Sequence, residues 1–205
     1  MNKNLSIVIP VYNERESLSL MVKILNSTLD FDNEIIIVYD NEEDNSIPIA
    51  KKLSTQFSNI SLVHNTLGQG VKYALKAGVD KSKYDNILIT AVDEIFPILS
   101  IDRMLNMIVK EDYDFVSGTR YKKGGKRLGG SLIGHMLSLL ANRSFSMITN
   151  FPLSDSTTGI KMMKKNFKIV KKKISCKEMK LLIIIMSYQI KLIVNFRKLL
   201  QNQLP

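Results

Sequence analysis

The sequence predicts an α/β fold with a mainly parallel sheet flanked by helices. Short apolar runs rich in β-branched residues alternate with longer amphipathic stretches through the first half of the chain, and this alternation is typical of strands joined by helices. A chain of 205 residues suits one domain, or one domain with an appendage. Hydrophobic residues make up 45% of the chain and charged residues 23%, an ordinary globular composition that excludes wholesale disorder.

Five runs are predicted to form strands because each is short, mostly apolar and followed by polar residues. In chain order they are Leu5–Val11, Glu34–Tyr39, Ile60–His64, Asn86–Thr90 and Asp114–Ser117. Because a helical stretch separates each run from the next, we expect right-handed crossovers and a mainly parallel sheet that is covered on both faces.

The stretches between these strands are predicted to form helices. In chain order they are Ser17–Leu29, Ile47–Phe57, Gly70–Val79 and Ile101–Val109. In the first of them, five apolar side chains recur at helical spacing: Leu18, Met21, Val22, Leu25 and Leu29. Glu14 and Glu16 lie near its start, where the helix dipole favours acidic residues.

Charge is divided unevenly along the chain. Residues 1–119 hold 11 lysines and arginines against 17 acidic residues, a net charge of −6. Residues 120–205 hold 18 against two, a net charge of +16. Such a basic half is typical of a surface for phosphates, anionic lipid or nucleic acid. A solvated lysine-rich surface without a specific partner is the alternative interpretation.

Cysteine content and hydropathy indicate the compartment. The single cysteine, Cys176, excludes a disulfide framework and a cysteine-based zinc site, and it is typical of a reducing compartment. The longest apolar run, Leu181–Met186, is far shorter than the ~18 residues of a spanning helix. The N-terminal residues lack the pattern of a secretory signal, so we expect a cytoplasmic chain.

Polar residues follow four of the predicted strands. They are Tyr12–Glu14, Asp40–Asp44, Asp93–Glu94 and Gly118–Tyr121. Ligands of parallel sheets lie beyond the carboxyl ends of the strands, so these segments form the candidate site. Carboxylates that coordinate a divalent cation, opposite a basic loop, are suited to a metal–diphosphate ligand. Ordinary turn chemistry remains the alternative explanation for any one of these loops.

Other kinds of site find little support. The loop after the first strand contains no glycine, which disfavours a Rossmann oxidoreductase, and no Walker A sequence occurs. His64 and His135 are isolated in the sequence, so neither a histidine-based zinc site nor a Ser-His-Asp triad is indicated.

Four segments resemble one family. Ile9–Glu14 resembles the opening motif of family-2 glycosyltransferases with the GT-A fold, and Val38–Asn41 occupies the place of that family's second-strand aspartate motif. Ser117–Tyr121, followed by Lys122–Gly125, is similar to the dolichol- or polyprenol-phosphate mannosyltransferase branch, and so is Pro152–Lys161. The resemblance runs from about Leu5 to about Lys168. We therefore expect a GT-A domain over residues 1–168 and a basic, helical tail over residues 169–205.

The resemblance implies a donor site for a nucleotide-diphosphate sugar. Three residues would line the nucleotide pocket and a fourth would bind the base: Pro10, Tyr12, Glu14 and, for the base, Asp40. A mismatched base would leave that carboxylate buried and unpaired, which gives selectivity. Asp93 and Glu94 would lie where the family holds Mg²⁺ or Mn²⁺ against the donor diphosphate.

The resemblance also implies an acceptor side. Arg120, Lys122 and Lys123 would bind the acceptor phosphate, as a forked donor and two point charges. Asp155 would lie near the acceptor, and Asp93, Arg120 and Asp155 would be the catalytic residues.

The implied reaction moves a sugar from a GDP- or UDP-sugar to a polyprenyl phosphate, with inversion at the anomeric carbon. An ionised acceptor phosphate needs little help from a general base, so catalysis would rest on positioning and on stabilising the departing diphosphate. The basic half would attract the phosphate at the inner face of a membrane, and the protein would be peripheral there.

Two departures from the family pattern bear on activity. The family usually shows Asp-x-Asp before a proline, whereas alignment on Pro97 puts Thr90 and Val92 at those positions and shifts Asp93 and Glu94. From about Ile174 onward, the expected acceptor segment does not appear. The tail then has three interpretations: an interfacial helix on anionic lipid, a packed terminal helix, or an altered or truncated reading frame.

Three functions follow from these observations. The first is a metal-dependent glycosyltransferase acting on a prenyl phosphate or another membrane-proximal acceptor. The second is a relative that binds nucleotide sugar or a partner but turns over poorly. The third, a nucleic-acid-binding protein, ranks last because the chain lacks a recognisable motif and only 7% of its residues are aromatic. Nothing in the sequence indicates an oligomeric state.

Overall fold

The protein is described here by a computed structural model, which covers residues 3–121, 136, 139, 142–143, 154–155 and 158–167. The chain divides into two compact units. The first consists of Met1–Gly118 and Gly159–Phe167, and the second of Thr119–Thr158 and Lys168–Pro205. The predicted domain boundary after residue 168 and the predicted tail lie outside the described residues.

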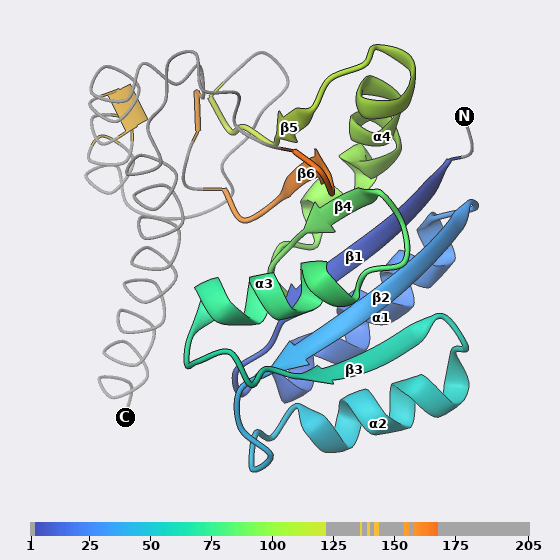
Figure 1. Ribbon diagram of the computed structural model, residues 1–205, viewed down its shortest axis with the longest axis vertical. Coiled ribbons are helices and arrows are strands. Elements are labelled where there is room, and N and C mark those ends of the chain that lie inside the picture. Colours follow the sequence, from blue (N-terminus) through green and yellow to red (C-terminus); the bar gives the residue numbers. More distant parts are fainter. Residues whose placement is uncertain are drawn as a thin grey trace. The chain divides into compact units, whose positions relative to one another are not determined.

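The first unit contains a six-stranded sheet (Figure 1). Its strands are β1 (Asn4–Pro10), β2 (Asp32–Tyr39), β3 (Ile60–His64), β4 (Asn86–Ile89), β5 (Phe115–Ser117) and β6 (Lys161–Lys164). Its helices are α1 (Arg15–Thr28), α2 (Ile47–Gln56), α3 (Val71–Lys81), the 3₁₀ turn η1 (Phe96–Ser100) and α4 (Ile101–Lys110).

The strands lie in the order β3-β2-β1-β4-β6-β5. β1 pairs in parallel with β2 and β4, and β2 pairs in parallel with β3. β6 is antiparallel to both of its neighbours, β4 and β5. The predicted α/β class and the mainly parallel sheet are therefore confirmed.

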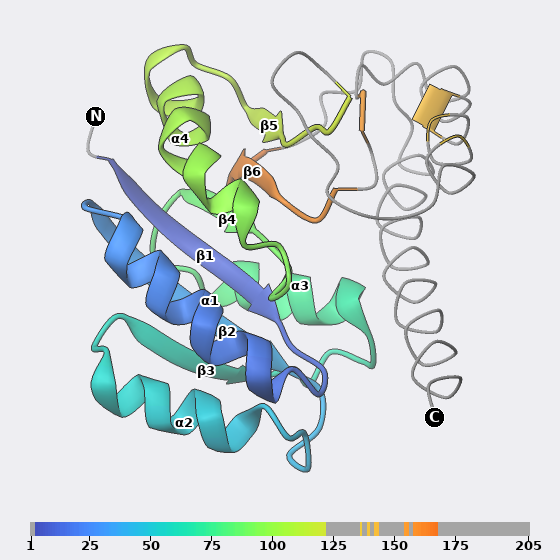
Figure 2. The same ribbon diagram turned by 180° about the vertical axis from the view of Figure 1, so that it is seen from behind.

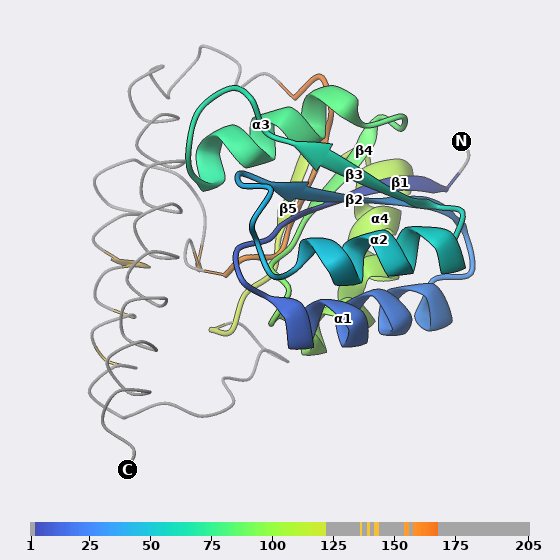
Figure 3. The same cartoon turned by 90° about the horizontal axis from the view of Figure 1, so that it is seen from below.

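Helices cover both faces of this sheet, as the crossover pattern predicts. α3 lies on one face, and α1, α2 and α4 lie on the other (Figures 2 and 3). The alternating residues of β1 separate accordingly: Ile7 packs in the cluster with α1, and Val8 packs in the cluster with α3. A strand buried on both faces reads as an unbroken apolar run, which is why β1 and β2 stand out in the sequence.

Helix α3 approaches the sheet closely through Gly78. A Cβ atom on this residue would lie 2.9 Å from Cγ2 of Val38, and it would meet Cγ1 of Val8 closer still. Only a glycine allows the backbone of the helix to pack directly on β1 and β2 at this point.

Within residues 3–121 and 158–167, two elements appear that the sequence pattern did not predict. η1 follows the Asp93–Glu94 loop and carries Pro97 in its first turn. β6 reads KMMK, with charged ends and no β-branched residue, so its pattern does not indicate a strand. It forms because the chain returns to pair with β4 and β5.

Candidate functional site

The carboxyl ends of three adjacent strands bring the predicted donor residues of the first unit to one edge of the sheet. Pro10 is in register with Val38 of β2, and Val8 is in register with Ile89 of β4. Because these strands run in parallel, the segments that start at Val11, Asp40 and Thr90 all leave the sheet at the same edge. We call these segments, together with the loop after β3, the carboxyl edge.

The loop after β1 is held by side chains of the loop after β2. The backbone N–H of Asn13 donates to both carboxylate oxygens of Asp44, each 3.1 Å away. The N–H of Glu14 donates to Oγ of Ser46 at 2.8 Å, and the Ser46 N–H in turn donates to Asp44 at 2.8 Å. Asp44 and Ser46 are both buried, whereas Tyr12 is 61% exposed. The backbone of the loop is therefore held by two buried side chains, while Tyr12 is exposed to solvent.

Asp40 is half-buried directly after β2. Its Oδ1 accepts a hydrogen bond from Nδ2 of Asn65 at 2.6 Å, and its Oδ2 accepts one from the backbone N–H of Gly70 at 2.7 Å. Both donors belong to the segment between β3 and α3. The orientation of the predicted base-binding carboxylate is therefore set by that segment.

An aromatic pair directly precedes Asp40 and Asn65 in the chain. The rings of Tyr39 and His64 stack with centroids 5.1 Å apart and planes 4° apart. The Tyr39 hydroxyl donates to Oε1 of Glu42 at 3.1 Å, and Nδ1 of His64 lies 3.6 Å from the same oxygen. Burial, and then the contact with Glu42, raises the pKa of Tyr39 above 10.0. The hydroxyl therefore stays protonated and remains a donor throughout the physiological range.

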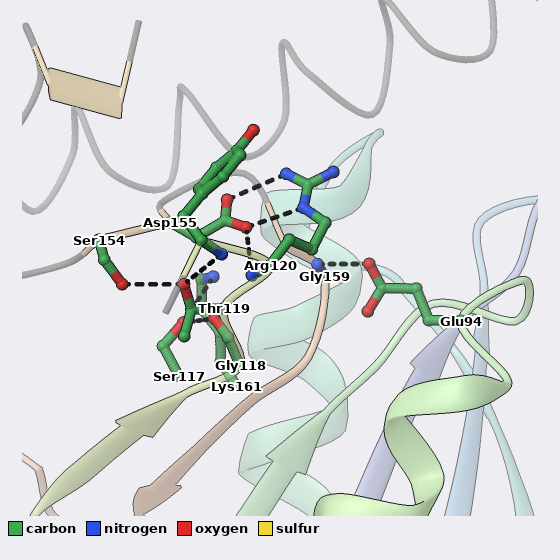
Figure 4. Close-up of polar contacts among 10 residues, drawn as sticks. Glu94, Ser117, Gly118, Thr119, Arg120, Ser154, Asp155, Gly159 and Lys161 are labelled. Carbon is green, nitrogen blue, oxygen red and sulfur yellow. Dashed lines mark hydrogen bonds and ion pairs between the residues drawn. The ribbon is translucent and has the colours of Figure 1, made fainter. Parts of the chain in front are cut away.

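The loop after β4 carries the two predicted metal ligands. Asp93 is exposed, while Glu94 is half-buried and its Oε1 accepts a hydrogen bond from the N–H of Gly159 at 2.7 Å (Figure 4). A Cβ atom at residue 159 would lie 3.0 Å from that oxygen, so a glycine suits the contact. Thr90 and Val92, which the alignment on Pro97 puts at the positions expected for the family's two aspartates, are both buried.

The carboxylates of Asp93 and Glu94 suit a cation whose coordination is completed by the phosphates of a substrate. Among the described residues, no group of three or more histidine, cysteine or acidic side chains could hold a metal ion. Mg²⁺, however, is commonly bound by one or two carboxylates together with substrate phosphates and water. Asp93, with Glu94 beside it, fits that pattern of binding.

In the second unit, Arg120 and Asp155 form a bidentate ion pair (Figure 4). Nε of Arg120 lies 2.8 Å from Oδ2, and Nη2 lies 3.0 Å from Oδ1. The Arg120 N–H also donates to Oδ2, at 3.1 Å, and Asp155 is 1% exposed. Nearby, Ser154 donates to Oγ1 of Thr119 at 2.8 Å. Sequence analysis expected Arg120 to bind the acceptor phosphate and Asp155 to lie near the acceptor. In the structure these two side chains contact each other. Lys122 and Lys123 lie outside the described residues.

Sequence analysis missed Asn65 and Ser46, and it gave Asp44 no role of its own. Asn65 could have been found, because it directly follows a predicted strand, as Asp40 does. Asp44 was included only as part of an acidic run, and its link to Asn13 spans 31 residues of sequence, which no local pattern reveals.

The family model named "Glycosyl transferase family 2" matches residues 6–169 of this chain. The chain belongs to glycosyl transferase family 2. Among its curated relatives in the family, a dolichol-phosphate mannosyltransferase of Pyrococcus furiosus is 31% identical over 122 residues, which are 59% of this chain and 34% of the relative. The glycosyltransferase GlyG of Streptococcus pneumoniae is 30% identical over 123 residues, covering 59% and 40%. The match to these family members therefore spans less than half of their length.

Solved structures show that this family member has the GT-A fold. A mannosyltransferase from Pyrobaculum calidifontis, in complex with GDP-Man and Mn²⁺, superimposes with a TM-score of 0.55 at 15% identity, over 80% of this chain and 44% of that one. Glucosyl-3-phosphoglycerate synthase from Mycobacterium tuberculosis, in complex with Mn²⁺, UDP and phosphoglyceric acid, gives 0.59 at 15% identity, over 79% and 56%. The expected fold and family are confirmed.

The described part of this family-2 chain contains no helix with both the length and the apolar character needed to cross a bilayer.

Proposed function

We propose that this family-2 glycosyltransferase moves a sugar from a nucleotide-diphosphate sugar to a phosphate acceptor carried by a lipid. One observation supports the donor half above all: Asp40, preset by two internal donors, and the Asp93–Glu94 loop follow β2 and β4, which flank β1 in parallel, and so leave the sheet at one edge. Such a donor requires a fixed carboxylate that binds the base. It also requires carboxylates, here those of Asp93 and Glu94, that hold a cation against the diphosphate.

In this proposal the chain's own residues bind and orient the donor. Asp40 accepts hydrogen bonds from the base, while Pro10, Tyr12 and Glu14 line the nucleotide pocket. Asp93 and Glu94 would hold Mg²⁺ or Mn²⁺, which when bound supplies positive charge against the donor diphosphate. The ionised acceptor phosphate attacks the anomeric carbon, the bond to the diphosphate breaks with inversion, and the nucleoside diphosphate leaves.

In this scheme Arg120 both pairs with Asp155 and binds the acceptor phosphate. Because Asp155 engages Nε and Nη2, the guanidinium is held in one orientation, in which it is proposed to bind the acceptor phosphate. Lys122 and Lys123 are proposed to add charge nearby, and Asp155 acts on the acceptor side through Arg120.

The acceptor is proposed to be a polyprenyl phosphate. Two observations support this class: the 31% identity to a dolichol-phosphate mannosyltransferase and the net charge of +16 on residues 120–205. A basic segment is attracted to anionic lipid, so we propose peripheral binding at the cytoplasmic face of a membrane.

A second candidate function is binding of a nucleotide sugar without efficient turnover. Alignment on Pro97 favours it, because this alignment puts Thr90 and Val92, both buried, where the family has its aspartates. A loop with a shifted carboxylate could bind the cation too weakly to stabilise the departing diphosphate.

A transfer assay separates the two candidates. Radiolabelled GDP- and UDP-sugars are incubated with the full chain, Mg²⁺ or Mn²⁺, and polyprenyl phosphate, and the product is extracted into organic solvent. We expect transfer that requires the lipid phosphate and falls about 100-fold or more in Asp93→Ala. Asp80→Ala, an exposed carboxylate in the last turn of α3, is the matched control and should retain full activity. Nucleotide binding without transfer would support the second candidate, and neither binding nor transfer would contradict both.

A further inference from the structure

Asn65 is a buried polar residue at the carboxyl edge that the proposed reaction does not use. It directly follows β3 and is 5% exposed. Its backbone N–H donates to the carbonyl oxygen of Tyr39 at 2.8 Å, which continues the pairing of β3 with β2 by one residue. This bond places its side chain beside the residue that follows Tyr39, which is Asp40.

The side chain of Asn65 makes three further hydrogen bonds. Nδ2 donates to Oδ1 of Asp40 at 2.6 Å and to the carbonyl oxygen of Gly68 at 2.6 Å. Oδ1 accepts from the N–H of Leu67 at 3.0 Å. The amide nitrogen thus makes two hydrogen bonds and the amide oxygen one, and only one of the three contacts the carboxylate.

The same segment supplies the second donor to Asp40. Gly70, whose φ is +102°, precedes α3 and directs its N–H at Oδ2 of Asp40 at 2.7 Å. Gly68, with φ of +140°, lets the segment turn back so that its carbonyl meets Asn65. One short segment therefore holds both carboxylate oxygens from within the protein.

Each carboxylate oxygen has two lone pairs, so two internal bonds leave two acceptor directions. Their direction in space is set by the plane of the carboxylate, and that plane is set by Asn65 and Gly70. The strength of a hydrogen bond from a base N–H group depends on its angle at the acceptor as well as on its length. Rotation of the carboxylate would therefore weaken binding of the base without changing the phosphate contacts.

We propose that Asn65 is a positioning residue that sets the carboxylate plane of Asp40 and thereby the base selectivity of the donor site. The inference rests on the proposed function, in which Asp40 binds the base. It adds that selectivity depends on the Nδ2–Oδ1 bond, and not only on the presence of the carboxylate.

Two variants of Asn65 separate this role from simple support of the loop. Asn65→Asp keeps the shape and the acceptor for Leu67, but it puts an oxygen opposite Asp40 and the Gly68 carbonyl. Asn65→Ala removes all three side-chain bonds. If Asn65 only supported the loop through Leu67, the aspartate variant would bind normally. If it positions Asp40, both variants lose base binding, and the aspartate variant loses at least as much.

The matched control is Asn59, at the opposite end of β3. Its Nδ2 donates to Oδ1 of Asn33 at 2.8 Å, so Asn59→Ala also removes an amide-to-side-chain bond beside the same strand, away from the carboxyl edge.

The experiment measures, by calorimetry on the full chain with Mn²⁺, the affinities for UDP, GDP and inorganic pyrophosphate. Thermal unfolding establishes that each variant is folded. In both Asn65 variants we expect the affinity for the preferred nucleotide to fall about 10- to 100-fold, while pyrophosphate affinity changes less than about twofold. The ratio of the UDP and GDP affinities should move toward one, and Asn59→Ala should match the wild type.

Other outcomes overturn the inference. Nucleotide affinity that is unchanged in Asn65→Asp, or that falls in parallel with pyrophosphate affinity, would show that Asn65 supports the loop only. Asp40→Ala distinguishes this from failure of the proposed function. If Asp40→Ala loses base selectivity while the Asn65 variants keep it, only the positioning role is wrong. If Asp40→Ala also keeps it, or the wild type binds neither nucleotide, the donor site itself is wrong.

Discussion

Arg120 and Asp155, 35 residues apart in the chain, meet through two parallel hydrogen bonds of 2.8 and 3.0 Å between guanidinium and carboxylate. The carboxylate is buried, and it also accepts the backbone N–H of Arg120. The pair ties together the two segments on which the resemblance to the prenol-phosphate branch depends. Its first role is thus to hold these two segments together, and the proposed binding of phosphate depends on that.

Removing one partner of this pair should be costly. We expect Asp155→Ala to lower the free energy of unfolding by about 3 kcal/mol, because a partly buried guanidinium loses the buried carboxylate that it contacts through two hydrogen bonds. Denaturant unfolding measures this. The control is Asp102→Ala, which removes an exposed carboxylate 2.8 Å from Lys3 and should cost about 0.2–1 kcal/mol. Equal losses in the two variants would show that the Arg120–Asp155 pair is not a structural contact.

The geometry of the pair should matter as well as its charge. Arg120→Lys keeps the charge but loses the fork that matches the carboxylate, so we expect it to recover less than half of the stability lost in Arg120→Ala. The same unfolding measurement tests this, and full recovery would contradict a role for the bidentate geometry.

The loop after β1 depends on the backbone of Asn13, whose φ is +57°. We expect Asn13→Gly to change stability by only a few tenths of a kcal/mol, whereas Asn13→Val should cost about 1–2 kcal/mol, because a β-branched residue is strained in this conformation. Thermal unfolding compares the two variants. Equal stability would mean that the loop adopts a different backbone conformation.

Close packing of α3 is tested at Gly78. Gly78→Ala gains helix propensity but forces a Cβ atom against Val8 and Val38, so we expect a net loss of about 1–3 kcal/mol. The double variant Gly78→Ala, Val8→Ala should lose less than the sum of the two single variants, because it makes room for the added methyl group. Strict additivity would show that the two residues are not in contact.

Alkaline pH should weaken the fold through Tyr39. Burial, and then the contact with Glu42, raises the pKa of Tyr39 in the folded protein. Tyr39 therefore ionises at lower pH in the unfolded chain than in the folded one. The contribution of Tyr39 to the free energy of unfolding is present below about pH 10 and is lost as the pH rises further. Tyr39→Phe should make the fall of stability above pH 10 shallower, as measured by denaturant unfolding. A fall of stability in Tyr39→Phe that is as steep as in the wild type would contradict this role of Tyr39.

Most of the sheet could be predicted from the sequence, because its central strands are buried on both faces. Ile7 and Val8 enter opposite clusters, and this demands the apolar run that the analysis recognised. β6 could not be predicted, because its strand character comes from long-range pairing and not from its composition.

The site was predictable where one rule sufficed. Asp40 and Asp93 follow parallel strands, and the topology brings their segments to one edge as expected. The contacts that orient these residues were not predictable, since they join positions far apart in sequence. Asp40 with Asn65, 25 residues apart, and Arg120 with Asp155 are the clearest examples.

The central claim, that the carboxyl edge binds a nucleoside diphosphate through Asp40 and a divalent cation, is tested most directly by ligand-dependent thermal unfolding. The account predicts that UDP or GDP with Mn²⁺ stabilises the wild type by about 2.7 kcal/mol at a hundredfold excess over the dissociation constant. Asp40→Ala should abolish this stabilisation, and chelation of Mn²⁺ should reduce it. No stabilisation of the wild type by either nucleotide, or equal stabilisation of Asp40→Ala, would contradict it.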